Sequence, residues 1–417
     1  ECMYNFDKEI LRKNTDCAKW DMNPAAADEK MISMWVADMD FEVLPEVKKA
    51  LHERVEHGVF GYSFAGREFK DAVISWMERR HDWEVRQEWM VPVSGIVPGL
   101  KAAVNTFTQP GDEVLVFKPV YYPFDLSVEE NGRKLIPFEM TLKDGHYELD
   151  FEALDKFLEQ HSIVMAILCS PHNPVGKVWS EEEQKKLGAL LKKYGIFTVS
   201  DEIHMDLVHQ GYRHIPFLKA NPDMAGQTIV CTAPSKTFNL AGLQTSVLVV
   251  PDEQNRKKLN RYISRSGMTP PGILGMTAAT AAYTHGDQWV DELNDYVWGN
   301  MMFMKEWLAE KFPEIKVIDP QGLYLLWADF RALNLDSKEL EKAMLEEAHL
   351  WLDEGYIFGS SGAGFERFNL ACPRSTVKKA LEQLEPVLQK YLRKGNNANT
   401  FDSSVVVVEE GTAAVDE

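Results

Sequence analysis

A series of short apolar runs in the middle of the chain most constrains its fold. Each run has strand length and bounded ends; they are Glu113–Phe117, Ile163–Cys169, Ile196–Val199, Thr228–Cys231 and Thr245–Val250. They are apolar almost throughout, as is typical of strands buried on both faces. Helical patterns lie between them: we expect Ser180 to cap a helix, Glu183 to close a capping box and Gly195 to end that helix. The alternation predicts an α/β fold, a mostly parallel sheet with helices on both faces.

The domain organisation follows from length and from a change of pattern near Gly286. The chain has 417 residues, which is enough for two domains. After Gly286, longer charged helices flank one strand-like run, 322–327, which predicts a smaller α+β domain. In the last helix, Pro386 predicts a kink or a break. We expect an N-terminal segment (1–46) packed on the small domain, a large domain (47–286), the small domain (287–394) and a disordered tail (395–417).

Charge and composition exclude several classes of protein. The 45 basic and 64 acidic residues give a net charge of −19, which disfavours binding to nucleic acid or to anionic lipid. No apolar run is long enough to cross a membrane, and the first residues show no signal-peptide pattern. The five cysteines form no CxxC pair. We therefore expect neither a disulfide framework nor a metal site, and a cytoplasmic location.

Lys236 lies just after the Thr228–Cys231 run, within Ala233–Gly242. A lysine that leaves a strand among apolar residues can be partly desolvated, which lowers the pKa of its ammonium group. Such an amine can form a Schiff base with an aldehyde. From this segment alone, an ordinary surface lysine is the alternative.

Asp201 and Asn173 also follow buried runs. Side chains at the carboxyl ends of parallel strands project into the crevice where ligands bind. A carboxylate there can keep a pyridine nitrogen protonated, and an amide can hydrogen-bond a ring oxygen. The simpler alternatives are a helix N-cap for Asp201 and an Asn-Pro turn for Asn173.

Gly95 and Ile96 stand where a strand turns into a helix. The exposed N–H groups of a helix start can bind phosphate, and Ser235 can add a hydroxyl. Tyr121, after the Glu113–Phe117 run, can stack on a flat heteroaromatic ring. A generic turn and ordinary core packing are the alternatives.

Two arginines of the second domain, Arg367 and Arg374, can offer a planar pair of donors to a substrate carboxylate. Arg367 is the preferred candidate. The alternative for either is a surface ion pair.

Taken together, these segments resemble the fold-type I pyridoxal 5′-phosphate (PLP) enzymes of the class I/II aminotransferase superfamily. The resemblance extends to about Lys394 and is strongest to the MalY/PatB branch, the cystathionine β-lyases or C–S lyases, which include cystalysin. It implies the aspartate aminotransferase-like fold. The motifs that carry it are 34–41 (MWVADMDF), 121–124 (YYPF), 170–176 (SPHNPVG), 200–204 (SDEIH) and 233–242 (APSKTFNLAG).

The resemblance also implies roles for individual residues. Lys236 would be the Schiff-base lysine, Asp201 the partner of the pyridine nitrogen, Asn173 the partner of the ring oxygen and Tyr121 the stacked, assisting ring. Gly95, Ile96 and Ser235 would bind the phosphate, His204 would lie at the cofactor, and Arg367, Tyr122 and Arg374 would bind substrate. Tyr62 would reach the phosphate of the neighbouring subunit's cofactor, which implies a homodimer with shared active sites.

Two departures from the aminotransferase pattern favour the lyase branch: His204 stands where transaminases commonly have tyrosine, and Gln244 where they have arginine. The expected reaction is α,β-elimination from L-cystathionine, cysteine or another amino-acid thioether, giving a thiol, pyruvate and ammonia. The alternatives are an aminotransferase, a lyase that also binds a transcriptional regulator, and a catalytically inactive scaffold.

Overall fold

The computed structural model describes residues 3–401, with side chains up to Arg393. Its larger sheet has seven strands in the order β2-β10-β9-β8-β7-β3-β4. Only β10 runs antiparallel to its neighbours within this sheet. The strands are β2 (Met90–Val93), β3 (Glu113–Lys118), β4 (Lys134–Glu139), β7 (Ile163–Cys169), β8 (Phe197–Asp201), β9 (Thr228–Thr232) and β10 (Ser246–Val249). The five apolar runs are therefore strands, as the sequence predicts.

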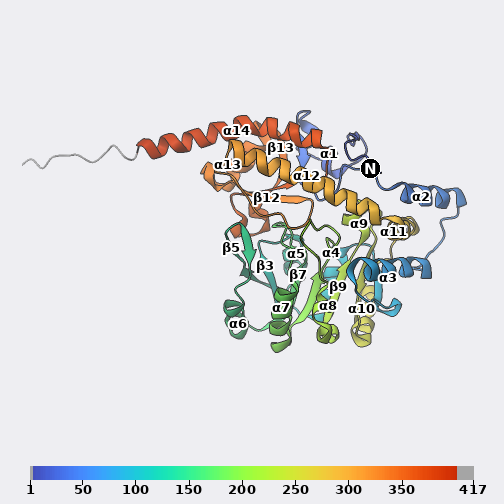
Figure 1. Cartoon of the computed structure of the whole chain (residues 1–417). Coiled ribbons are helices and arrows are strands. Elements are labelled where there is room, and N and C mark those ends of the chain that lie inside the picture. The colour runs from blue at the N-terminus through green and yellow to red at the C-terminus, as the bar shows by residue number, and fades with distance from the viewer. Residues whose placement is uncertain (1–2, 402–417) are drawn as a thin grey trace, which may run out of the picture.

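Helices cover both faces of this sheet (Figure 1). Alternate residues of β3 show this directly: Val114 and Val116 belong to one core cluster, Leu115 and Phe117 to the other. The first cluster includes side chains of α4 (Ile96–Phe107), α5 (Pro123–Glu129) and α10 (Glu253–Ser266). The second includes side chains of α2 (Pro45–His57), α3 (Arg67–His81), α6 (Phe151–Gln160), α7 (Glu181–Lys193), α8 (Phe217–Ala220) and α11 (Ile273–His285). The capping box of α7, Ser180 with Glu183, is present as predicted.

A second sheet of five strands has the order β1-β13-β14-β12-β11. Its strands are β1 (Ile32–Met34), β11 (Lys316–Val317), β12 (Leu325–Asp329), β13 (Leu350–Glu354) and β14 (Phe365–Asn369). The N-terminal strand β1 pairs parallel to β13, whereas the other pairs are antiparallel. The remaining elements are α1 (Ala18–Asp21), the hairpin β5 (Thr141–Lys143) and β6 (His146–Glu148), α9 (Pro234–Thr237), α12 (Asp287–Lys311), α13 (Ser337–Lys342) and α14 (Arg374–Phe401). The predicted domain boundaries stay a prediction.

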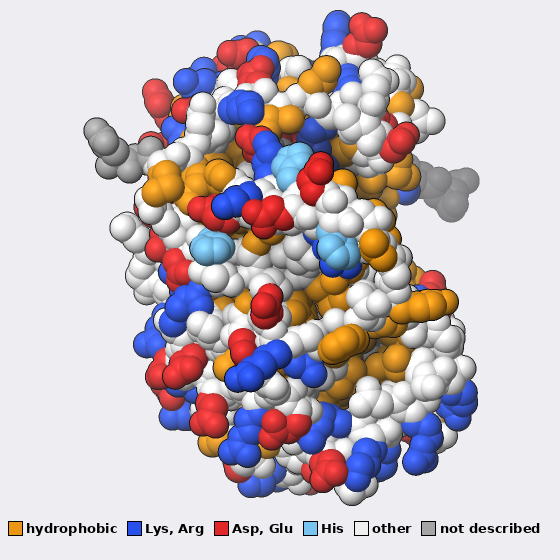
Figure 2. Space-filling view, turned by 90° about the vertical axis from the view of Figure 1, so that its right-hand side faces the viewer, with side chains coloured by type: hydrophobic (Ala, Val, Ile, Leu, Met, Phe, Trp, Pro, Cys, Tyr) orange, Lys and Arg blue, Asp and Glu red, His pale blue; other side chains and the backbone are white. Residues whose placement is uncertain are grey.

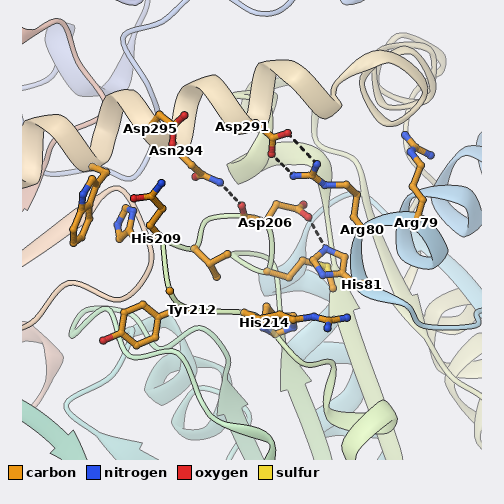
Figure 3. A pocket seen from close by; sticks show the side chains of 16 residues that line it. Arg79, Arg80, His81, Asp206, His209, Tyr212, His214, Asp291, Asn294 and Asp295 are labelled. Carbon is orange, nitrogen blue, oxygen red and sulfur yellow. Dashed lines mark hydrogen bonds and ion pairs between the residues drawn. The ribbon is translucent and has the colours of Figure 1, made fainter.

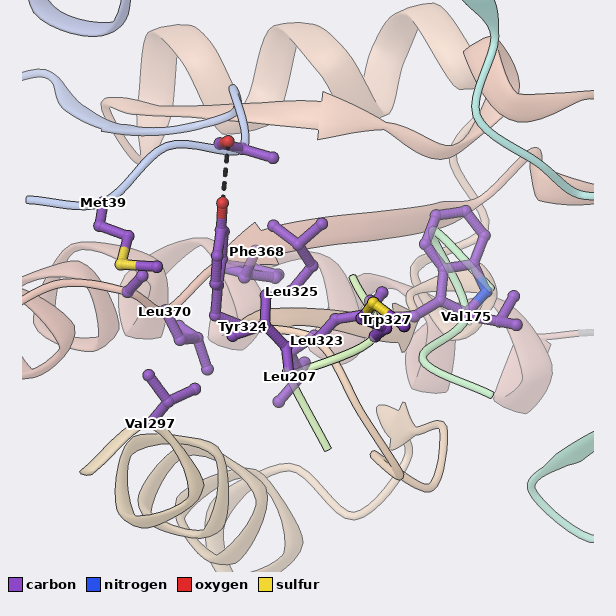
Figure 4. Close-up of a cluster of buried hydrophobic side chains, with 14 of the residues drawn as sticks. Met39, Val175, Leu207, Val297, Leu323, Tyr324, Leu325, Trp327, Phe368 and Leu370 are labelled. Atoms are coloured by element: carbon purple, nitrogen blue, oxygen red, sulfur yellow. Dashed lines mark hydrogen bonds between the residues drawn. The ribbon is translucent and has the colours of Figure 1, made fainter. Parts of the chain in front are cut away.

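A buried cluster around Tyr324 connects this sheet to the N-terminal segment and to α12 (Figure 4). Tyr324 is 1% exposed, and its hydroxyl donates to the carbonyl oxygen of Ala37 at 2.9 Å. Met39 and Val297, on either side, are also buried. The N-terminal segment is thereby attached where β12 begins, close to the site described below.

The last helix differs from the prediction in two ways. α14 continues through Pro386, so a break there is wrong. Pro386 is exposed, and water can satisfy the carbonyl that loses its intrahelical partner. The helix also extends to Phe401, so residues 395–401 are helical rather than the start of a tail, because a helix packed along its earlier turns adds further residues easily. Residues 402–417 of the expected tail lie outside the described residues.

Candidate active site

Lys236 lies in the short helix α9, directly after β9. Its Nζ donates to the carbonyl oxygen of Ala37 at 2.6 Å. Burial lowers the pKa of Lys236 to about 8, with Asp38 and Asp201 opposing and Arg367 adding to the shift. About a tenth of such an amine is unprotonated at pH 7, roughly two to three hundred times more than for an ordinary lysine. Lys236 is therefore suited to act as a nucleophile.

Asp201 ends β8 and is 3% exposed. Its Oδ1 accepts a hydrogen bond from the backbone N–H of Ile203 at 3.2 Å. Burial raises the pKa of Asp201 to about 7, and the charge of Glu202 adds to this, while the Ile203 N–H and Lys236 oppose it. The carboxyl group is thus poorly solvated and would gain from a cationic partner.

His204 is 4% exposed, and its Nδ1 has no hydrogen-bonding partner among the described residues. Burial lowers the pKa of His204 well below its usual value, and the charges of Lys236 and Arg367 add to this effect. The ring is therefore neutral and holds an unpartnered polar atom close enough to Lys236 to feel its charge. Such an orphaned group is typical of a site that binds a polar ligand.

The predicted phosphate residues gather around one cavity of about 250 Å³. Gly95, Ile96, Tyr121, Ser235 and Lys236 all line it. Gly95 is the N-cap of α4, so the first N–H groups of this 12-residue helix are available at the cavity. Its wall also contains the polar residues Ser94, Gln244, Thr245 and Ser246. The cavity is therefore suited to an anion such as phosphate, although Gln244 supplies no positive charge.

Arg367, from β14, meets Asn173 from the loop after β7. Its Nη1 donates to Asn173 Oδ1 at 3.0 Å, and its Nη2 donates to Asp353 Oδ2 at 2.5 Å and to the carbonyl of Trp35 at 2.5 Å. Arg367 is 2% exposed, and its Nε has no partner among the described residues. Burial raises the pKa of Asp353, and Arg367 opposes this. A buried arginine held in this way can offer its free donor to a substrate carboxylate.

Tyr121 and Tyr122 close the side of the site near Asn173. The backbone N–H of Tyr121 donates to the carbonyl of Asn173 at 3.1 Å, and the two tyrosine rings lie 5.7 Å apart. Burial raises the pKa of both phenols, and the charge of Asp353 adds to the rise at Tyr122. Both hydroxyls therefore stay protonated at neutral pH.

Two predicted site residues are not brought into this group. Arg374 begins α14, where its Nε donates to Asn300 Oδ1 at 2.6 Å and its guanidinium lies over the ring of Tyr296. These contacts join α14 to α12, and the expected substrate contact of Arg374 stays a prediction. Tyr62 lies fully exposed between α2 and α3, and among the described residues no hydrogen bond, ion pair or ring contact connects it to the cavity.

Three acceptors in the site were not predicted from the sequence. The carbonyl groups of Trp35 and Ala37 accept hydrogen bonds from Arg367 and Lys236, and Asp353 pairs with Arg367. Trp35 and Ala37 lie in the 34–41 motif, but no side chain indicates that their backbone carbonyls act as acceptors. Asp353 could be found only from the register of β13 beside β14.

Comparison with known proteins identifies the family. The family model for aminotransferase class I and II matches residues 29–384. The chain belongs to this family. It is 41% identical over 385 residues to cystathionine β-lyase PatB of Bacillus subtilis (strain 168), covering 92% of this chain and 100% of that protein.

Solved structures agree with the family and its fold. Cystalysin from Treponema denticola, whose structure contains a pyridoxal 5′-phosphate cofactor, matches with a TM-score of 0.90 and 38% identity over 93% of this chain and 99% of that one. The PLP-bound C–S lyase from Staphylococcus hominis matches with a TM-score of 0.86 and 32% identity over 92% and 98%. The chain therefore has the aspartate aminotransferase-like fold that the sequence predicted.

Proposed function

We propose that this chain is a PLP-dependent carbon–sulfur β-lyase that cleaves L-cystathionine, and other cysteine S-conjugates, into a thiol, pyruvate and ammonia. The observation that carries the proposal is the pairing of Lys236, whose pKa is lowered to about 8, with the poorly solvated Asp201 beside a phosphate-sized cavity. The names of the relatives support the lyase activity: PatB is a cystathionine β-lyase and the Staphylococcus hominis protein a C–S lyase.

The residues present fit PLP. Lys236 would hold its aldehyde carbon, Asp201 its protonated pyridine nitrogen and the start of α4 its phosphate. Asn173 accepts from Arg367 through Oδ1, which leaves its Nδ2 free to donate to the ring oxygen. The unpartnered Nδ1 of His204 adds a further polar contact. When bound, PLP supplies an electron sink for the substrate's α-carbon.

The chain's own residues would then bind substrate and move protons. Arg367 binds the α-carboxylate and orients the α-carbon toward Lys236. Lys236 takes the α-proton as a general base, for which a pKa of about 8 is well suited. The protonated phenol of Tyr121, which lines the same cavity as Lys236, would donate a proton to the departing sulfur. Overall, thioether and water give a thiol, pyruvate and ammonia, so neither an oxidant nor a keto acid is consumed.

The test is a pyruvate assay on purified protein loaded with PLP and given L-cystathionine without a keto acid. We expect pyruvate and homocysteine in equal amounts, and no pyruvate from Lys236→Ala. An aminotransferase would require a keto acid and would leave the carbon–sulfur bond intact. A protein that binds PLP but releases no pyruvate from cystathionine or from other cysteine S-conjugates would refute the lyase proposal.

We propose further that two copies of the chain share their active sites. The segment between α2 and α3 exposes Val59, Phe60, Tyr62 and Phe64, of which Tyr62 and Phe64 are 112% and 81% exposed. Figure 2 views the side on which α2 and α3 lie in Figure 1, and hydrophobic side chains gather there beside a hollow. Exposed apolar groups of this kind are typical of an interface.

Complementation tests the shared site. We mix Lys236→Ala chains with Tyr62→Ala chains under conditions that exchange subunits. If Tyr62 serves the neighbouring site, each mixed dimer regains one intact site and lyase activity reappears. Separate sites would leave the mixture no more active than its components.

We also propose that the protein works in the cytoplasm. Cys17, Cys169, Cys231 and Cys372 are free thiols, as is usual in a reducing compartment. Among the described helices, none combines the length and the apolar character needed to cross a membrane.

A further inference from the structure

The carboxylate of Asp206 connects several elements behind the active site. It follows β8, and its side chain is 3% exposed. Oδ1 accepts a hydrogen bond from Trp76 Nε1 at 2.9 Å and lies 2.6 Å from His81 Nε2, both on α3. Its backbone carbonyl accepts from Asn294 on α12 at 2.8 Å, as Figure 3 shows.

The second carboxylate oxygen reaches the lysine helix. Thr237 Oγ1 donates to Asp206 Oδ2 at 2.8 Å, and Thr237 is fully buried. Lys236 precedes Thr237 directly, and His204 lies two residues before Asp206. One carboxylate therefore joins the segment that carries His204 to the segment that carries Lys236.

The position of α9 depends on hydrogen bonds from outside this helix. α9 has four residues, too few for its own backbone bonds to hold it rigid. A cavity of about 430 Å³ lies beside Asp206, lined by side chains from α3, from the segment after β8 and from α12 (Figure 3). Burial raises the pKa of Asp206, but His81, Thr237 and Trp76 together lower it below its usual range. Asp206 is therefore an anionic acceptor at neutral pH.

We propose that Asp206 is a positioning residue: through Thr237 it holds the amine of Lys236 in its desolvated place beside the carbonyl of Ala37. The proposal deepens the proposed function, because it rests on Lys236 being the reactive amine. Without the Thr237 hydroxyl, Oδ2 loses its partner, α9 gains freedom and Lys236 becomes better hydrated. Better hydration favours the ammonium form, so the amine becomes less reactive at neutral pH.

The experiment measures the amine itself. Full-length protein without cofactor is labelled with trace acetic anhydride between pH 6 and 10, and acetylation of Lys236 is quantified by peptide mass spectrometry. Thr237→Val removes the hydroxyl at nearly constant shape, and Thr237→Ser retains it. We expect a threefold to tenfold loss of labelling at pH 7 in Thr237→Val, which corresponds to a pKa rise of about half to one unit, and recovery to within about twofold in Thr237→Ser.

Trp76→Phe is the matched control. It removes the other neutral donor to the carboxylate of Asp206 while leaving the Thr237 bond in place. A purely structural network would lower the melting temperature in both variants and leave the labelling profile of Lys236 unchanged. That result, or an equal shift in Trp76→Phe and Thr237→Val, would overturn the proposal. If Thr237→Val does not fold, Thr237→Ala takes its place with the same expected loss.

The labelling separates this proposal from the proposed function. It reads Lys236 without PLP or substrate, so a failed pyruvate assay leaves its result intact. In the loaded enzyme we expect Thr237→Val to lower kcat more than it raises KM, because Arg367, which binds the substrate carboxylate, makes no contact with Thr237 in the described bonds.

Discussion

Replacing Asp201 by asparagine tests whether the site presents a carboxyl group in need of a cationic partner. In cofactor-free protein, burial raises the pKa of Asp201 from 3.8 to about 7. A carboxyl group whose pKa is higher in the folded than in the unfolded protein binds more protons when folded. The free energy of unfolding therefore falls as pH rises through the window between these two values.

The size of the effect follows from the shift. About three pKa units at 1.36 kcal/mol each give about 4 kcal/mol in total, of which about 2–3 kcal/mol is lost between pH 5 and pH 8. Asparagine cannot ionise, and its side-chain oxygen can still accept from the N–H of Ile203. The free energy of unfolding of the variant, relative to that of the wild type, should therefore be about 2–3 kcal/mol higher at pH 8 than at pH 5.

Urea unfolding of both cofactor-free proteins at pH 5 and pH 8, followed by circular dichroism, measures this difference. Most other titrating groups are common to the two proteins and cancel. With PLP bound, Asp201→Asn should be less stable than the wild type, because a protonated pyridine nitrogen favours the carboxylate. The variant should therefore bind PLP more weakly and gain less stability from it. A stability difference that is the same at both pH values would refute the reasoning about burial.

Three further changes probe the same structure. Gln244→Arg places a cation at the phosphate-sized cavity, and a charge-assisted hydrogen bond should tighten PLP binding about tenfold by absorbance titration. Glu202→Gln removes a charge that raises the pKa of Asp201, so the pH dependence of unfolding should move to lower pH. Gly355→Ala puts a Cβ 1.9 Å from the carbonyl oxygen of Gly362 and should cost at least about 2 kcal/mol of stability in urea unfolding. Gly226→Ala, with open space around it, should cost little and is its control.

In the seven-stranded sheet, the two strands that lie outside the five predicted apolar runs share a physical reason. β2 and β4 are the two edges of the seven-stranded sheet, and they contain Pro92 and Pro137. Proline is tolerated at an edge because one side of the strand needs no ladder hydrogen bonds. Edge strands also bury less, and each residue of β4 is exposed or half-buried. The inner strands were predictable because burial on both faces gives a continuous apolar run.

The positions of some site residues follow from the local sequence, whereas those of others depend on packing between distant elements. Asp201 and Asn173 were predictable because the carboxyl ends of parallel strands meet at one edge, wherever those strands stand in the sequence. The position of Arg374 was not predictable, for the opposite reason. An arginine binds the best acceptor within reach, and Asn300 is brought to it by the packing of α12 against α14, which its own motif does not encode.

Arg367 shows how both kinds of information combine in one residue. Its own motif identified it, but its orientation depends on Asp353, Trp35 and Asn173, which come from three distant parts of the chain. Nη1 and Nη2 already donate hydrogen bonds, so the guanidinium is held in place before any ligand binds. Among the described residues, Nε has no partner. If Arg367 binds the substrate carboxylate as proposed, that carboxylate would meet a guanidinium whose plane is already fixed, with Nε among its remaining donors. In that proposal, the contacts that hold the arginine would orient the substrate as much as the arginine itself.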